Sequence, residues 1–212
     1  MFVKVDSNTL ILFIFSSAVL AISPGPDNIF VLIQSVTNGA KYGIATVLGL
    51  VTGCLVHTTL VAFGVSAIIK NNDTLYLIIK IVGALYLLYL AYKVFKSDAS
   101  INLSSAELPK KSVLQLYKQG FIMNVLNPKV SIFFLAFFPG FLFSTSMNTI
   151  SQFYVLGVLF MIVTFIVFSS IALLAGLISN YLKKHKQTSF YLKWLQIIVF
   201  IGIAIFILFS DK

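Results

Sequence analysis

Long apolar runs alternate with short polar connections along the whole chain. A helix needs about 20 mainly apolar residues to cross the hydrocarbon core of a bilayer. Six runs approach or exceed that length, at approximately residues 10–33, 43–69, 75–92, 120–143, 153–182 and 191–209. The pattern therefore predicts an all-α integral membrane protein with six transmembrane helices.

Two of the six segments contain helix-breaking residues near their middle. The first holds Ser23-Pro24-Gly25-Pro26-Asp27-Asn28, and the fourth holds Asn127-Pro128-Lys129. Proline removes a backbone donor and disfavours helical dihedrals in the residue before it. Lipid cannot bond the backbone groups that such a break frees, so the break has to be buried in protein or line a watery cavity. Helices 1 and 4 are thus predicted to be interrupted.

The two halves of the chain show a weak duplication. Pro24 and Pro128 each follow a residue type that commonly caps helices, Ser23 and Asn127 respectively. The tripeptide Val-Leu-Gly ends at Gly49 in one half and at Gly157 in the other. The predicted organisation is a three-helix repeat over residues 1–97, a cytoplasmic linker over 98–117 and a second three-helix repeat over 118–212. Three is an odd number of spans, so the copies would be inverted, an architecture found in secondary transporters.

Composition supports a membrane protein and excludes an ordinary soluble domain. The chain is 59% hydrophobic and only 10% charged, with a mean hydropathy of +1.01, whereas soluble domains carry roughly 25% charged residues. The formal net charge of +9 would indicate nucleic acid as a partner of a soluble protein. In a membrane protein, lysines that flank the spans instead orient the chain and meet anionic lipid, so no nucleic-acid partner is predicted.

The distribution of lysine predicts the orientation. Most lysines fall in the connections between segments 1 and 2, 3 and 4, and 5 and 6. Because positive charge marks the cytoplasmic side, both termini are expected outside the cytoplasm.

The chemistry of the two breaks suits a small zwitterion. A half-helix that starts at each break would point free amides and the positive end of its dipole toward the bilayer centre, where they bind a carboxylate. Asp27 would receive an ammonium group or carry a proton, and Lys129 would pair with Asp27 or hold a carboxylate. Two alternatives stay open: Asp27 and Lys129 form a structural ion pair, or Lys129 snorkels to an interface. The candidate substrate- or ion-binding residues are Ser23, Pro24, Gly25, Pro26, Asp27, Asn28, Asn127, Pro128 and Lys129.

Three further features of the apolar segments carry alternative interpretations. His57 is either a member of a proton relay or a histidine bonded to a neighbouring carbonyl. Gly49 and Gly53 form Gly-x-x-x-Gly, which allows close helix packing. For Asn124 the structural role is favoured, and Cys54 is expected to be a small buried apolar residue.

These residues together resemble the LysE/RhtB family of amino-acid exporters. The resemblance rests on residues 23–28, on the glycine-spaced second segment and on Asn124-Val125-Leu126-Asn127-Pro128-Lys129 with the Phe-rich run that follows. It covers essentially the whole chain. It implies six membrane helices and export of amino acids or close derivatives from the cytoplasm, driven by the proton motive force or by exchange. It does not fix which amino acid is exported.

Three other functions are weighed against export. A carrier of metal or inorganic ions on a related three-plus-three scaffold is disfavoured by two histidines, one cysteine and the lack of an acidic cluster in the membrane segments. An enzyme is disfavoured because the sequence has no nucleophile elbow and no His-Glu-x-x-His motif. A non-transport membrane subunit remains as the last alternative. No cofactor and no bound metal are predicted.

Overall fold

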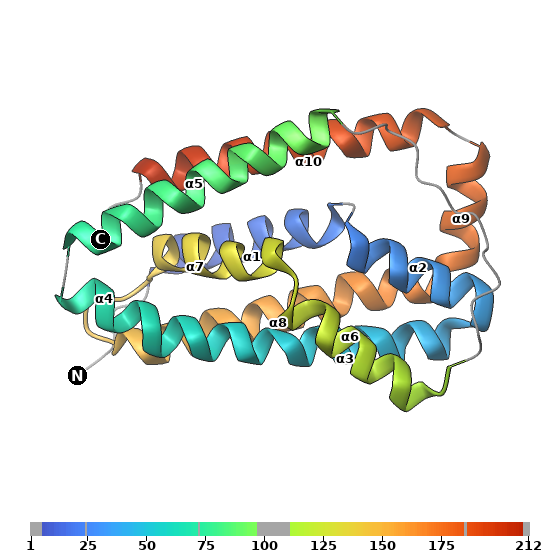
Figure 1. The fold of residues 1–212 in the computed structure, drawn as a ribbon, viewed down its shortest axis with the longest axis horizontal. Helices are drawn as coiled ribbons and strands as arrows, with labels where there is room; N and C mark the ends of the chain where they lie inside the picture. The colour runs from blue at the N-terminus through green and yellow to red at the C-terminus, as the bar shows by residue number, and fades with distance from the viewer. Residues whose placement is uncertain (1–5, 24, 72, 97–110, 185, 210–212) are drawn as a thin grey trace.

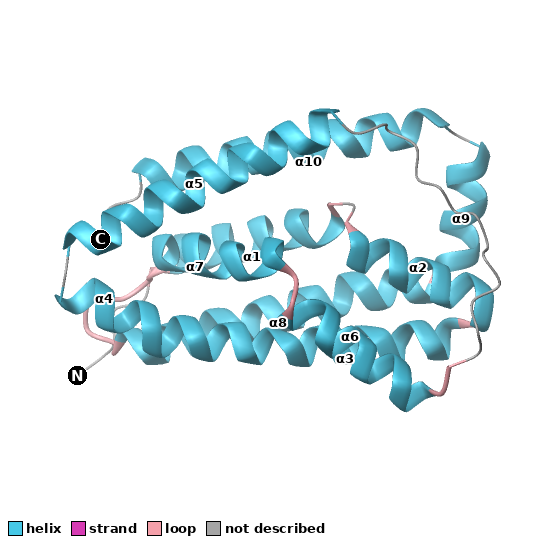
Figure 2. Ribbon diagram, in the orientation of Figure 1, coloured by secondary structure: helices cyan, strands magenta, loops and turns pink. Residues whose placement is uncertain are grey.

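The part of the chain that the structure describes is helical throughout. The structure is a computed structural model, and it describes residues 6–23, 25–71, 73–96, 111–184 and 186–209. No strand occurs within these ranges (Figure 2). Four helices are long and apolar enough to cross a membrane, or up to six when each of two bent helix pairs counts as one span. The predicted all-α membrane fold is thereby confirmed at this level.

The helices lie side by side in an elongated bundle (Figure 1). In chain order they are α1 (Ser7–Ile22), α2 (Pro26–Asn38), α3 (Ala40–Leu60), the π-helical turn η1 (Val61–Val65), α4 (Ser66–Asn71), α5 (Asp73–Lys96), α6 (Val113–Val125), α7 (Pro128–Phe137), the 3₁₀ turn η2 (Phe138–Phe141), α8 (Thr149–Leu173), α9 (Ala175–Lys184) and α10 (Lys186–Phe209). Helices α5 and α10 pack along one side of the bundle, and α3 packs against both α6 and α8 on the other. Helices α1 and α7 lie between these layers (Figure 1).

Successive spans run in opposite directions along the bundle. The start of α1 and the end of α10 lie at the same end, on the left in Figure 1. The junction of α2 with α3, the end of α5, the start of α6 and helix α9 lie at the opposite end. Counting each bent pair as one crossing gives alternating crossings that begin and finish on the same side.

The first predicted break is present, but its cap differs from the prediction. Helix α1 ends at Ile22, α2 begins at Pro26, and their axes are bent by 60°. Ser23 is not the N-cap of the second half-helix, because it terminates α1 and its hydroxyl donates to the Val19 carbonyl at 3.0 Å. The N-cap is Gly25, since Pro26 has no amide hydrogen to bond and therefore fits the first helical position. The predicted break residue Pro24 lies outside the described residues.

The second break follows the prediction closely. Helix α6 ends at Val125, and α7 begins at Pro128 with a bend of 53° between them. Asn127 is the N-cap, and its side-chain oxygen accepts a hydrogen bond from the Lys129 amide at 3.0 Å. Pro128 then occupies the first helical position, where a missing amide hydrogen costs nothing.

Two helices differ in extent from the apolar segments of the sequence. Helix α6 begins at Val113, before the apolar segment expected from about residue 120, so residues 113–117 of the predicted linker are helical. Ser112 and Gln115 form a reciprocal capping box there, a local signal strong enough to start a helix. The fifth apolar segment, expected as one span over 153–182, is divided: α8 ends at Leu173, and the amphipathic helix α9 follows. The residues after 178 include serine, asparagine and lysines, which suit an interface better than the bilayer interior.

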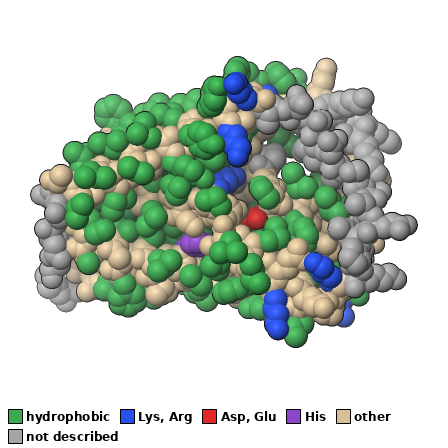
Figure 3. Space-filling model, in the orientation of Figure 1, with side chains coloured by type: hydrophobic (Ala, Val, Ile, Leu, Met, Phe, Trp, Pro, Cys, Tyr) green, Lys and Arg blue, Asp and Glu red, His purple; other side chains and the backbone are tan. Residues whose placement is uncertain are grey.

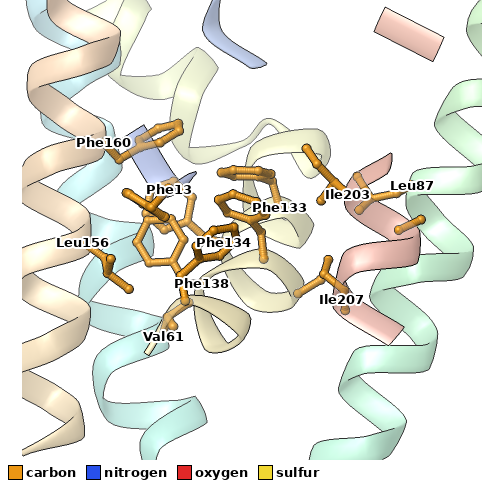
Figure 4. Packing of buried hydrophobic residues seen from close by; sticks show 14 of the residues in the cluster. Phe13, Val61, Leu87, Phe133, Phe134, Phe138, Leu156, Phe160, Ile203 and Ile207 are labelled. Atoms are coloured by element: carbon orange, nitrogen blue, oxygen red, sulfur yellow. The ribbon is translucent and has the colours of Figure 1, made fainter. Parts of the chain in front are cut away.

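A cluster of phenylalanines holds the second half-helix in place. Phe133, Phe134, Phe137 and Phe138 of α7 and η2 are almost completely buried. Phe13 of α1 lies among them, with ring centroids 5.6 Å from Phe137 and 5.3 Å from Phe138. Figure 4 shows Phe13, Phe133, Phe134 and Phe138 between α8 on one side and α5 and α10 on the other. Each close aromatic pair contributes about 0.5–1.5 kcal/mol beyond its buried area, so the cluster fixes α7 against α1 and α8.

Glycines allow α3 and α6 to approach each other closely. A Cβ at Gly49 would lie 2.0 Å from the Tyr117 carbonyl oxygen, and one at Gly120 would lie 2.3 Å from the Thr46 carbonyl oxygen. A Cβ at Gly53 would lie 2.7 Å from Asn124 Oδ1. The backbones of α3 and α6 are therefore in direct contact at these glycines. This contact fixes the position of Asn124, which lies next to the second break.

Candidate functional site

A cavity lies where the two broken helices meet. The empty space between its walls is about 550 Å³, a figure that includes the open solvent at its mouth. Its polar wall consists of Asp27, Asn28, Asn124, Asn127, Lys129 and Thr164. Its apolar wall includes Leu20, Val130, Phe133, Phe160 and Phe168. Residues from both interrupted helices and from α3 and α8 thus line one space.

A single asparagine joins the two breaks. Asn127 Nδ2 donates to Asp27 Oδ2 at 3.1 Å, across 100 positions of the sequence. The same side chain accepts from the Lys129 amide and so caps α7. Asp27 is only 8% exposed, and a buried carboxylate is stable only when it is bonded or paired. Asn127 therefore satisfies a buried acid in one half of the chain while it starts a helix in the other.

Lys129 faces the first break from the second half of the chain. Its Nζ lies 3.4 Å from the position that a Cβ on Gly25 would occupy, and 5.1 Å from the centre of the Phe200 ring. Asp27 receives its described hydrogen bond from Asn127 rather than from Lys129. One anionic and one cationic side chain thus line the same cavity, and no direct ion pair joins them in the described contacts.

The remaining residues of the first break divide into cavity-lining and structural positions. Gly25, Pro26 and Asn28 line the cavity. Asn28 Nδ2 also donates at 2.7 Å to the Ala21 carbonyl, one of the backbone groups that the break frees. Ser23 is fully buried and bonded within α1. Pro128 is exposed at the start of α7 and is not among the residues that line the cavity.

His57 and Asn124 connect α3 to the end of α6. His57 Nε2 lies 3.1 Å from the Asn124 carbonyl oxygen, which also accepts the Asn127 amide at 3.0 Å. The imidazole packs against the Phe134 ring, with centroids 5.4 Å apart. His57 borders a separate pocket beside Ser131 and Phe134 instead of the main cavity. This contact is the one expected for a histidine bonded to a neighbouring carbonyl.

Sequence comparisons assign the chain to a known family. Residues 18–211 match the family of the LysE type translocator. The chain belongs to this family. It is 29% identical over 175 residues to the homoserine/homoserine lactone efflux protein of Salmonella typhimurium, covering 82% of this chain and 84% of that protein. It is also 29% identical over 185 residues to the leucine efflux protein of Salmonella choleraesuis, covering 87% of each. No solved structure matches the chain.

Membership of the LysE family confirms the resemblance seen in the sequence. It makes the chain a multi-pass membrane protein whose named relatives are efflux proteins rather than enzymes. Figure 3 shows a largely apolar surface on the visible face, as expected for contact with lipid. The lysines visible on that face lie between the middle of the bundle and the end that holds α2, α6 and α9.

The translocator cavity contains residues that the sequence alone did not single out. Thr164, Phe160 and Phe168 of α8 all line it, and so do Val130 and Phe133 of α7. The sequence did mark Thr164 as unusual, because Thr164 and Tyr154 are the only polar residues within the apolar stretch 153–168. Cys54 is fully buried, as expected, and also reaches the cavity wall.

The cavity offers separate partners for the two charges of a zwitterion. Asp27 supplies a carboxylate, Lys129 supplies an ammonium group, and the asparagines supply neutral donors and acceptors. Within the described ranges, no group of three or more His, Cys, Asp or Glu side chains lies close enough to hold a metal ion. The apolar wall beside these groups suits the carbon skeleton of an amphipathic molecule.

Proposed function

We propose that this translocator exports a small amino acid, or a close derivative, from the cytoplasm across a bacterial inner membrane. The observation that carries the proposal is the cavity at the meeting point of the two broken helices, with Asp27 and Lys129 in its wall. The names of the relatives, which include a leucine efflux protein and a homoserine efflux protein, support an amino-acid substrate.

The N-terminus of α2 and Lys129 would hold the substrate carboxylate. The N-cap of α2 is Gly25, which provides no side-chain hydrogen bond, so the first amides of α2 lack the side-chain acceptor that Asn127 supplies to α7. Free amides and the positive end of the helix dipole attract an anion, and Lys129 Nζ lies next to Gly25. The two groups together would form a carboxylate site.

Asp27 would hold the substrate ammonium group. Its Oδ2 already accepts from Asn127, which orients the carboxylate at the edge of the cavity. A carboxylate so placed can exchange its bound proton for a cationic group during a transport cycle. Asp27 is therefore the residue that we assign to coupling with the proton motive force.

The proposed mechanism is alternating access around this cavity. The chain would consist of two inverted three-helix repeats, with the bent pairs α1–α2 and α6–α7 as equivalent elements. The lysines visible in Figure 3 lie between the middle of the bundle and the end that holds α2, α6 and α9, which supports a cytoplasmic location for that end, with both termini on the other side.

Export from cells tests the proposal directly. The chain is expressed in a bacterium that lacks its own amino-acid exporters, the cells are loaded with dipeptides of leucine or homoserine, and extracellular amino acids are measured. We expect one amino-acid class to accumulate outside, and Asp27→Asn and Lys129→Met to abolish that accumulation. Lys118→Met is the matched control, because Lys118 is exposed and lies outside the cavity. Undiminished export by both cavity variants, at equal membrane levels, would refute the assigned site.

Proton coupling needs its own measurement. Everted membrane vesicles take up an exported substrate, so a proton gradient of known size can be imposed and then collapsed with an uncoupler. We expect uptake by the parent protein to fall to the rate of passive leakage when the gradient collapses. Uptake that is indifferent to the uncoupler would remove the proton from the mechanism and leave exchange as the driving process.

A further inference from the structure

The hydroxyl of Thr164 has no hydrogen-bond partner although it is buried. Thr164 is 5% exposed, and its Oγ1 is one of five buried side-chain atoms without a partner in the described part of the chain. Hydroxyls inside helices usually bond the carbonyl one turn earlier. Thr46, Thr58 and Thr59 of this chain do so, at distances of 3.1, 2.8 and 2.8 Å. Thr164 therefore departs from the pattern of its own fold.

Thr164 also lines the cavity, whereas most of the other residues with an unpartnered buried atom do not. Of those five atoms, only Thr164 Oγ1 and Asn124 Oδ1 belong to cavity-lining residues. Asn124 is 5% exposed and lines the cavity from α6, while Thr164 lines it from α8. An unmet buried polar atom costs free energy, and a bound molecule that supplies the missing hydrogen bond recovers that cost.

Aromatic rings flank Thr164 on the same face of α8. Phe160 lies one turn before it and Phe168 one turn after it, and both line the cavity. Phe133 of α7 packs on Phe160, with ring centroids 5.5 Å apart. The part of the cavity wall that these rings form is thus an apolar surface with a single hydroxyl in it. Such a surface accepts a short carbon chain and distinguishes whether that chain carries a polar group.

We propose that Thr164 makes this translocator select amino acids whose side chain carries a hydroxyl over aliphatic ones of equal size. This inference rests on the proposed function, because it assigns the side-chain end of the same cavity. The substrate side chain packs on Phe160 and Phe168, and its hydroxyl bonds Thr164 Oγ1. An aliphatic side chain of equal volume fills the space but leaves the Thr164 hydroxyl unbonded.

The expected discrimination is modest and measurable. One net hydrogen bond corresponds to a preference of about 3- to 10-fold between two ligands that differ only in that bond. Two isosteric pairs isolate the effect: homoserine against norvaline, and threonine against valine. In each pair a hydroxyl replaces a methyl group, so size and charge stay constant while hydrogen bonding changes.

The test compares export of both pairs by the parent protein and three variants of α8. We expect the parent to prefer the hydroxylated member, Thr164→Val to bring the ratio near one, and Thr164→Ser to keep the preference. Ser169→Ala is the matched control, because the Ser169 hydroxyl is also buried and unpartnered but Ser169 does not line the cavity. Its export ratio is expected to equal that of the parent.

A binding measurement on purified protein keeps this inference separate from the proposed function. The shift of the unfolding midpoint with each of the four amino acids gives the same comparison without transport. Unliganded Thr164→Val is expected to be at least as stable as the parent, since it removes an unsatisfied hydroxyl. An unchanged preference in Thr164→Val, with export intact, would overturn the role of Thr164 alone. If the parent neither binds nor exports any of the four but still exports another amino acid, this inference is overturned and the proposed function stands.

Discussion

The close approach of α3 and α6 predicts that Gly49→Ala destabilises the protein. The added Cβ would lie 2.0 Å from the Tyr117 carbonyl oxygen and 2.8 Å from the Phe121 amide nitrogen. Both are backbone atoms, which cannot move aside as the end of a flexible side chain can. The two helices have to separate, and overpacking of this kind costs about 1–3 kcal/mol.

Gly202→Ala is the matched control for this substitution. Gly202 is inside α10, and nothing lies within 4 Å of the position that its Cβ would occupy. Alanine is about 1 kcal/mol more favourable than glycine in a helix interior, and this gain applies to both variants. The difference in the free energy of unfolding between the two variants therefore measures the overpacking alone. We expect Gly202→Ala to be about 1–3 kcal/mol more stable than Gly49→Ala.

Thermal unfolding in detergent measures the effect, followed through the fluorescence of Trp194, the one tryptophan of the chain. Gly49→Ala is expected to unfold at a lower temperature than both the parent and Gly202→Ala. Export is expected to fall as well, because α6 carries Asn124 and leads directly into Asn127. Equal midpoints for the two variants would show that α3 and α6 do not pack as closely as the structure has them.

Two further predictions concern the polar contacts around the second break. Asn127→Ala and Asn148→Ala each remove a side-chain N-cap, of α7 and α8 respectively, at a cost of about 0.5–2 kcal/mol in the free energy of unfolding. Asn127→Ala is expected to cost more than Asn148→Ala, because it also removes the donor to the buried Asp27 carboxylate. Only Asn127→Ala is expected to abolish export, since only Asn127 bonds Asp27; equal export by the two variants would contradict a role for that bond. His57→Gln retains a side-chain donor for the Asn124 carbonyl and is expected to keep export and its uncoupler sensitivity, whereas His57→Leu is expected to lower the unfolding midpoint. Loss of proton coupling in His57→Gln would instead place His57 in a relay.

The breaks could be predicted from sequence because proline and its neighbours act locally. Pro26 and Pro128 determine where a helix begins whatever surrounds them, and both are first residues of helices in the structure. The identity of the caps was less certain. Ser23 and Asn127 have the same intrinsic tendency to cap, yet Ser23 bonds backward into α1. Two prolines within three residues moved the start of α2 beyond the reach of that serine.

Contacts between distant segments could not be predicted in the same way. Nothing local to Asn127 indicates that its amide meets Asp27, 100 positions away. Likewise, an abundance of phenylalanine is compatible with lipid contact, and only the fold shows that Phe133, Phe134 and Phe138 form a buried cluster. The polar position Thr164 was visible in the sequence, but its importance depends on which face of α8 meets the cavity.

The bond between Asn127 and Asp27 constrains how the cavity can open. It joins the starts of α2 and α7, which belong to different halves of the chain. A movement that separates these two half-helices has to break a hydrogen bond to a buried carboxylate, and charge-assisted bonds of this type are about twice as strong as neutral ones. A substrate ammonium group or a proton on Asp27 neutralises the charge that makes the bond strong. In the proposed mechanism, occupancy of the site and separation of the two half-helices would therefore be linked through the Asn127 side chain, and replacement of Asn127 should affect both.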